Sequence, residues 1–160
     1  MRRILIIALL ISSGVISAVA QRSSGPAKGI LIVDGGGLTD LVKDKFAELA
    51  GGSRARIVVI PTAASSIRFG DDKVILDPDW PRERAEWKAY EAYLKRWFGA
   101  DDVIIIHTRD RNTADSSSFV GPLKTATGVF LGAGNAGRLA TTYLGTKTQA
   151  ELEALLARGG

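Results

Sequence analysis

The sequence predicts an α/β domain with a doubly wound, mostly parallel sheet, because short apolar runs alternate with segments of helical periodicity. Four of these runs are apolar without interruption, which is typical of strands that are covered on both faces in a parallel sheet. They lie at residues 30–33, 57–60, 103–106 and 129–131. The order of strand and helix along the chain therefore favours a sandwich with helices on both sides of the sheet.

Two of the intervening segments predict the clearest helices. Residues 38–49 repeat apolar side chains at helical spacing and stop at the glycines of 51–52, which suit a helix terminus. Residues 82–98 place large apolar and aromatic side chains on one stripe. We expect Asp79 to cap this second helix and Pro81 to lie in its first turn.

The start of the chain has the pattern of a signal peptide. A short basic stretch precedes an apolar run at residues 4–19, and small residues lead up to Ala20. The competing interpretation is a membrane anchor, but the run is shorter than the roughly 20 residues that cross a bilayer. We therefore expect cleavage after Ala20, a mature N-terminus at Gln21, and a secreted or periplasmic protein without a stable membrane anchor.

These features divide the chain into three parts. Residues 1–20 are the expected signal peptide, residues 21–28 a flexible polar tether, and residues 29–160 belong to the α/β domain. Removal of the leader lowers the net charge from +4 to +2, because two of the 21 basic residues lie within it. This near balance, without a Lys- or Arg-rich run, excludes a typical nucleic-acid partner.

The composition also bears on disulfides and metals. The chain contains no cysteine and a single histidine, His107. Disulfides are therefore excluded, and a zinc site of the usual kind is not expected. We expect neither a metal nor a cofactor. His107 ends the third apolar run and would be the only imidazole base of the chain, although a structural role is the simpler interpretation.

Ligands of doubly wound sheets bind at the carboxyl ends of the strands, so the residues that follow each run are candidate site residues. The first run is followed by Gly35, Gly36 and Gly37, and the second by Thr62 and Ser65. We predict that these five residues line a pocket. The alternative is that both segments only turn the chain.

A glycine-rich turn and a helix start follow the fourth run. Gly132, Gly134 and Gly137 match the dinucleotide-binding fingerprint, and Glu151 or Glu153 lies near the position of a ribose-binding acid. Against this interpretation, the glycines follow the fourth run instead of the first, and no strand separates the turn from the acidic residues. Dinucleotide binding is therefore an alternative, not the main prediction.

Five blocks in the same order resemble the cyanophycinase and serine-type aspartyl dipeptidase (peptidase E-like) family. They are residues 32–37, 57–65, 130–139, 144–146 and 158–160, so that the similarity spans residues 29–160. The resemblance implies a three-layer sandwich of the class I glutamine amidotransferase type. It also implies that the catalytic serine and histidine lie after Gly160, so that this chain ends before the nucleophile strand and contains no catalytic residue.

The resemblance gives the glycine-rich turn a role. Residues Gly134, Asn135 and Ala136 would face the serine, bind substrate and frame the oxyanion. The family usually has glutamine where this chain has Ala136, and this difference removes an amide able to donate and accept hydrogen bonds.

The implied activity is hydrolysis of peptide or isopeptide bonds next to aspartate, with a peptide or an aspartate-containing polymer as substrate. A non-catalytic ligand-binding module of the same architecture stays open as an alternative, as does a homodimer.

Overall fold

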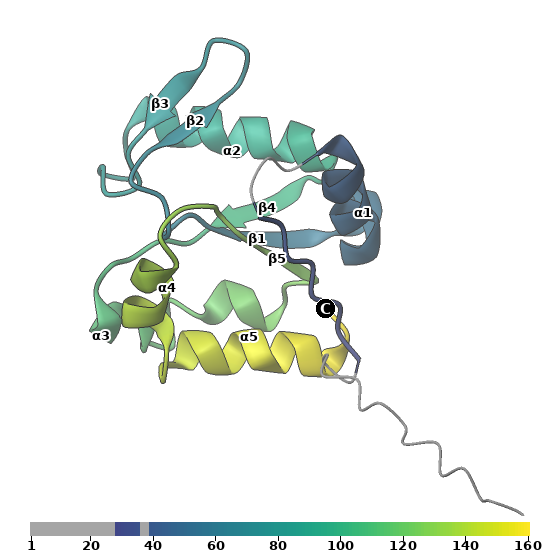
Figure 1. The fold of residues 1–160 in the computed structure, drawn as a ribbon, viewed down its shortest axis with the longest axis vertical. Helices are drawn as coiled ribbons and strands as arrows, with labels where there is room; N and C mark the ends of the chain where they lie inside the picture. Colours follow the sequence, from purple (N-terminus) through teal and green to yellow (C-terminus); the bar gives the residue numbers. More distant parts are fainter. Residues whose placement is uncertain (1–27, 36–38) are drawn as a thin grey trace, which may run out of the picture.

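The computed structural model describes residues 28–35 and 39–160 of the chain. The expected signal peptide, most of the tether, and Gly36 and Gly37 lie outside the described residues. The described part is a mixed α/β fold with a three-stranded parallel sheet and helices around it (Figure 1). No helix in these two ranges is long and apolar enough to cross a membrane.

Three of the four predicted strands form the sheet. They are β1 (Arg56–Ile60), β4 (Asp102–Ile105) and β5 (Gly128–Leu131), in the spatial order β4-β1-β5. Both pairs are parallel, which confirms the predicted parallel sheet. Because β1 lies between the other two strands, its carboxyl end is flanked by the loops that follow β4 and β5.

One face of the sheet packs against two helices. Ile57 and Val59 of β1 point to this face and are buried in a cluster with α1 (Asp40–Ala50) and α2 (Ala85–Phe98). The cluster is rich in aromatic rings, which pack at centroid distances near 5 to 6 Å, as between Phe98 and Phe130 at 5.6 Å. The predicted aromatic stripe of the second helix therefore faces the core.

The opposite face packs against a separate cluster. Val58 and Ile60 of β1 alternate with the residues of the first face and lie against η2 (Gly121–Lys124), α4 (Ala136–Tyr143) and α5 (Lys147–Arg158). The sheet is thus covered on both faces, and Figure 1 shows it between α2 on one side and α5 on the other.

The connection from β1 to α2 contains an antiparallel hairpin. It consists of β2 (Ile67–Phe69) and β3 (Val74–Leu76), which pair only with each other among the described strands. The hairpin projects beyond α2 at the top of Figure 1. Two short elements complete the described chain, η1 (Gly52–Arg54) after α1 and α3 (Arg111–Ala114) after β4.

The predicted ends of both helices are confirmed, since α1 ends at Ala50 and α2 at Phe98, but the start of α2 is not, because Pro81 lies before the helix and not in its first turn. Gly51 caps α1 in the left-handed conformation, as the glycine pair predicted. The prediction that Asp79 caps the second helix is wrong, because α2 begins at Ala85 after Arg84, which makes no side-chain cap hydrogen bond. The carboxylate of Asp79 instead pairs with the guanidinium of Arg109 and lies next to the ring Nε2 of His107.

The prediction of a strand at residues 30–33 is also wrong. The structure assigns no strand there, and the side chains of Leu31 and Val33 are 66% and 83% exposed. Strand propensity alone does not form a ladder: β1 uses both of its edges to pair with β4 and β5, and residues 30–33 form no ladder with the remaining edges of those two strands. The segment instead starts against the end of α5, where Gly29 closely approaches Leu156.

The unpaired edge of β5 leads to a prediction about association. Among the described strands β5 pairs only with β1, and Leu131 on it is 45% exposed. Free strand edges with apolar side chains promote association between chains. We expect the chain from Gln21 onward to self-associate and Leu131→Lys to shift it toward monomer in sedimentation velocity.

The matched control is Leu144→Lys, because Leu144 is equally apolar and 56% exposed but lies outside the strands. It should leave the association unchanged. A chain from Gln21 that is monomeric and unfolds in one sharp, cooperative transition would contradict the prediction.

Candidate functional site

Three loops meet at the carboxyl edge of the sheet. The loop after β1 is held to the loop after β5 by the Asn135 amide, which donates to the Ala63 carbonyl at 2.9 Å. The loop after β4 begins beside β1, where the Ile106 amide donates to the Val59 carbonyl at 3.0 Å. The side chains that follow the three strands are therefore brought together, as the topology predicts.

Thr62 is the centre of a buried polar network at this edge. Its side chain is fully buried, and its Oγ1 lies 2.9 Å from His107 Nδ1 and 2.6 Å from the hydroxyl of Tyr143 on α4. Burial raises the pKa of Tyr143, against hydrogen bonds from Thr62 and the Thr108 backbone. The hydroxyl of Thr62 is thus fully used inside the protein and does not face a ligand.

The network continues to a half-exposed carboxylate. His107 Nε2 lies 3.1 Å from Asp79 Oδ1, and Arg109 Nε lies 2.7 Å from each carboxylate oxygen of Asp79. Burial by itself would raise the pKa of Asp79, but the hydrogen bonds and charges of Arg109 and His107 outweigh it and lower that pKa. Burial lowers the pKa of His107, and the opposing effect of Asp79 does not cancel it.

The hydrogen bonds of this network have one direction at neutral pH. Ionised Asp79 only accepts, so Nε2 of His107 carries the hydrogen and Nδ1 of the neutral ring accepts. Thr62 must then donate to Nδ1 and accept from the hydroxyl of Tyr143. The chain of donors therefore runs from Tyr143 through Thr62 and His107 to Asp79, and a proton added to Nδ1 would reverse only the two hydrogen bonds of Thr62.

This order leads to a prediction about pH. The lowered pKa of folded His107 means that the unfolded chain, with a histidine pKa of about 6.5, takes up the proton first. The stabilisation is complete above about pH 6.5 and is lost as the pH falls toward the folded pKa. Urea unfolding should therefore show a decreasing free energy of unfolding over this range.

His107 is the only histidine of the chain, so the control for this prediction is simple. His107→Gln should be less stable at neutral pH and should lose the pH dependence just below pH 6.5. If the variant keeps the slope of the parent protein there, the dependence does not arise from His107.

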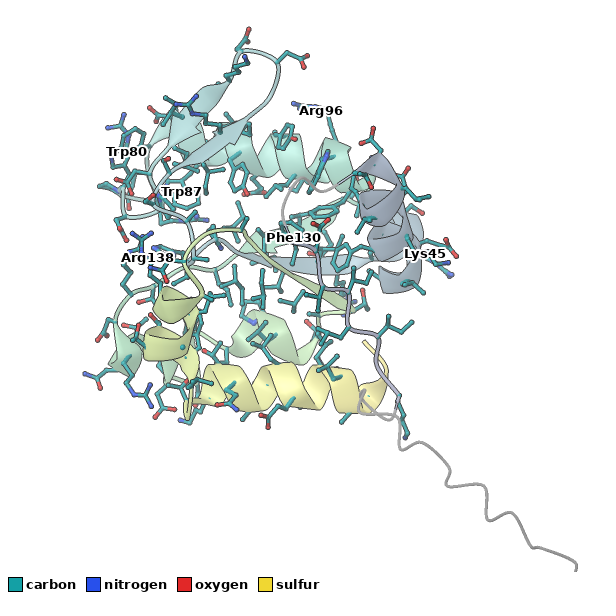
Figure 2. All side chains as sticks on the ribbon, in the orientation of Figure 1. Lys45, Trp80, Trp87, Arg96, Phe130 and Arg138 are labelled. Atoms are coloured by element: carbon teal, nitrogen blue, oxygen red, sulfur yellow. The ribbon has the colours of Figure 1, made fainter. Side chains whose placement is uncertain are left out.

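Two arginines hold the loop after β1 by its carbonyl groups. Arg109 donates from Nη1 to the Thr62 oxygen and from Nη2 to the Ala64 oxygen, both at 2.9 Å. Arg138 of α4, labelled in Figure 2, donates to the intervening Ala63 oxygen at 3.2 Å. Three consecutive carbonyls thus accept from guanidinium groups. The charge of Arg109 is paired with Asp79, whereas Arg138 forms no ion pair with the described residues.

The glycine-rich turn after β5 packs on the same loop. Gly134 has a φ of +142°, and a Cβ on it would collide with the carbonyl of Ala63. Its glycine is therefore required by the approach of another backbone. Asn135 is the N-cap of α4, because its Oδ1 accepts from the Gly137 amide at 2.8 Å.

Two backbone amides of the turn are available for a ligand. Those of Ala133 and Gly134 form no hydrogen bond with the described part of the chain, whereas the amides of Gly132 and Asn135 are used internally. Unpaired amides beside a helix start can stabilise a carboxylate or a developing oxyanion. Ala136 is exposed as the first residue of α4, next to these amides.

Two of the remaining predicted pocket residues lie at the surface. Gly35 and Ser65 are exposed, and a Cβ on Gly35 would have no neighbour within 4 Å. Thr62 is close to the turn but buried beneath it.

The amide of Gly137, the third glycine of the dinucleotide fingerprint, is not available to a phosphate group, because it donates to the side chain of Asn135. The acidic residue Glu153 binds Gln149 on α5 at 2.7 Å.

Three side chains of the network are not identified by the sequence patterns. The pattern around Asp79 predicts a helix cap, and no motif singles out Arg109 or Tyr143. The signal in the sequence was that Arg109 follows His107 by two residues at a strand end, where polar side chains point to the same edge.

No group of three or more His, Asp or Glu side chains in residues 28–35 and 39–160 could hold a metal ion.

No known family model matches this chain, and no curated protein matches it significantly.

Proposed function

We propose that the chain forms the substrate-binding part of a three-layer α/β sandwich hydrolase that cleaves peptide or isopeptide bonds next to aspartate, as the resemblance to cyanophycinases and aspartyl dipeptidases implies. One observation carries the proposal. The amides of Ala133 and Gly134 form no hydrogen bond within residues 28–35 and 39–160, and they lie at the carboxyl edge of the parallel sheet, beside the guanidinium groups of Arg109 and Arg138. Such a site suits an acidic substrate and a developing oxyanion.

In this proposal the described residues bind and orient the substrate. The aspartate carboxylate is attracted to the arginine-rich edge, and the scissile carbonyl oxygen approaches the amides of Ala133 and Gly134. The serine that attacks the carbonyl and the histidine that takes its proton are contributed by residues after Gly160. His107 is not the base in this proposal, because the hydroxyl that its Nδ1 engages belongs to Thr62, which is fully buried and does not reach a substrate.

The proposal includes export. The pattern of residues 1–20 supports a signal peptide that is cleaved after Ala20, which places the hydrolase outside the cytoplasm or in the periplasm. An extracellular or periplasmic location would also limit access to soluble nicotinamide cofactors, which is a further reason to prefer hydrolysis over dinucleotide chemistry.

The second candidate is a non-catalytic ligand-binding module. It is favoured by the burial of the Thr62 hydroxyl that pairs with His107 and by the use of Asn135 as a helix cap, since neither side chain then faces a substrate. The same two amides would bind a carboxylate ligand without cleaving it. The two candidates differ only in turnover, which makes a kinetic experiment decisive.

We expect no hydrolysis of aspartyl dipeptides or of an arginine–aspartate polymer by the 160-residue chain, and no labelling by a fluorophosphonate probe. A longer gene product that carries the downstream serine and histidine should be labelled and active, because a serine is a poor nucleophile without its base. Turnover and labelling are measured in parallel on both proteins.

A substitution at the turn provides the control. Ala136→Gln in the longer protein restores the amide that the family usually has, and it should increase kcat/KM for aspartyl dipeptides. Labelling of the 160-residue chain would place a nucleophile within it and contradict the assignment. Binding of aspartyl dipeptides by an unlabelled, inactive longer protein would favour the binding module.

A further inference from the structure

A second hollow, of about 650 Å³, lies between the β2-β3 hairpin, α2 and Lys43 of α1. It shares no lining residue with the network of Thr62, His107 and Asp79 or with the glycine turn. Any ligand it binds therefore occupies a site that is separate from the proposed hydrolytic edge, and its function goes beyond that proposal.

The floor of the hollow is one face of α2. Ala89, Ala92, Tyr93 and Arg96 follow helical spacing and line it together with Trp97. The two alanines leave the space open. The rings of Tyr93 and Trp97 are partly buried and nearly parallel, with centroids 6.1 Å apart and planes at 17°. The floor thus offers stacked aromatic surface.

The rim carries charges that are not neutralised inside the protein. Asp71 and Asp72 on the hairpin turn, and Arg96 on α2, are exposed and form no ion pair with the described residues. Lys43 is different, because Asp44 binds its amine at 2.8 Å. Figure 2 shows Arg96 on the hairpin side of α2. The hollow therefore has carboxylates on one side and a free guanidinium on the other.

The hairpin that carries the two aspartates is attached to α2. Phe69 of β2 packs against Tyr90 at 5.0 Å and against Tyr93 at 5.6 Å, so the hairpin is attached to α2 by aromatic contacts. Lys73 has a φ of 49° and Gly70 a φ of 71°, so the chain turns tightly around the two aspartates. The acidic rim is thus part of an ordered turn next to the aromatic floor.

We propose that this hollow binds a zwitterionic basic ligand of the arginine type, either the free amino acid or an arginine at a peptide end. The ligand's guanidinium stacks on Tyr93 and Trp97 and pairs with Asp71 and Asp72, while its carboxylate pairs with Arg96. A planar guanidinium suits both an aromatic face and carboxylates better than an ammonium does. The two aspartates exclude phosphate ligands by repulsion.

The test is a calorimetric titration of the 160-residue chain with L-arginine, with agmatine, which lacks the carboxylate, and with citrulline, which lacks the charge. We expect L-arginine to bind most tightly and citrulline not to bind. Arg96→Gln should weaken the binding of L-arginine about tenfold and leave the affinity for agmatine unchanged, because it removes one charge-assisted contact with the ligand's carboxylate. Asp72→Asn should weaken the binding of both L-arginine and agmatine.

Lys88→Gln is the matched control, because Lys88 is an exposed cation of α2 that does not line the hollow. It should leave all three affinities unchanged, and all variants should keep the parent unfolding midpoint because the changed side chains are exposed. Absence of saturable arginine binding, or equal weakening by Lys88→Gln, overturns the proposal. The hydrolysis assay is independent of this outcome, so the two proposals fail separately.

Discussion

Gly134→Ala is expected to destabilise the fold by at least about 2 kcal/mol, because a positive φ and a backbone collision act at the same position. The added Cβ would meet the carbonyl of Ala63, which already accepts from the Asn135 amide and from Arg138. The turn has to move away, and the amides of Ala133 and Gly134 then lose their direction. Urea unfolding and titration with an aspartyl dipeptide measure the two losses.

Gly121→Ala is the control for this substitution. A Cβ on Gly121 has no neighbour within 4 Å, and its φ is not in the left-handed region. Alanine should therefore be neutral there or slightly stabilising, since it reduces the freedom of the unfolded chain. If both variants unfold at the same urea concentration, the close contact between Gly134 and Ala63 is not a requirement of the fold.

Thr62→Val is expected to have the second large effect, a loss of about 1 to 3 kcal/mol, because it leaves buried polar atoms without partners. Valine has nearly the same shape as threonine, so the loss would come from the hydroxyl alone. His107 Nδ1 loses its donor and the hydroxyl of Tyr143 loses its acceptor. The measurement is the free energy of unfolding from urea titration at neutral pH.

Two further variants separate hydrogen bonding from packing. Thr62→Ser keeps the hydroxyl and should retain the His107 tautomer that has its hydrogen on Nε2, as read from ¹⁵N chemical shifts. Adding Tyr143→Phe to Thr62→Val removes the orphaned hydroxyl, so the double variant should lose less than the sum of the two single losses. Strict additivity would show that Thr62 and Tyr143 do not share a hydrogen bond.

The central sheet could be predicted from the sequence because its signal is local. The continuous apolar run of β1 is buried between two helical layers, and this burial produces the pattern, whereas the flanking strands β4 and β5 each keep an exposed apolar side chain, Ile104 and Leu131. Residues 30–33 have the same local pattern but no neighbouring ladder among the described strands. Apolar composition thus predicts a strand wherever it occurs, whereas pairing depends on residues elsewhere in the chain.

The candidate site was less predictable because its contacts join distant residues. Thr62 and His107 are 45 positions apart in sequence, and Thr62 and Tyr143 are 81 apart. Asp79 has the usual composition and position of a helix cap, and only the spatial approach of Arg109 explains why it does not serve as one. The sequence predicts a role for Gly134 in the turn, but the requirement for glycine there comes from the close backbone of Ala63, which no local pattern encodes.

The strand order β4-β1-β5 also has a consequence for the rate of folding. The central strand β1 has no partner near it in sequence, and the Arg56 amide binds a hydroxyl 71 positions away, that of Thr127. The chain must close long loops before the sheet gains any hydrogen bond, whereas the hairpin and α2 form from local contacts. We therefore expect stopped-flow refolding to show early helix formation, followed by a slower phase in which the parallel sheet and its polar edge assemble together.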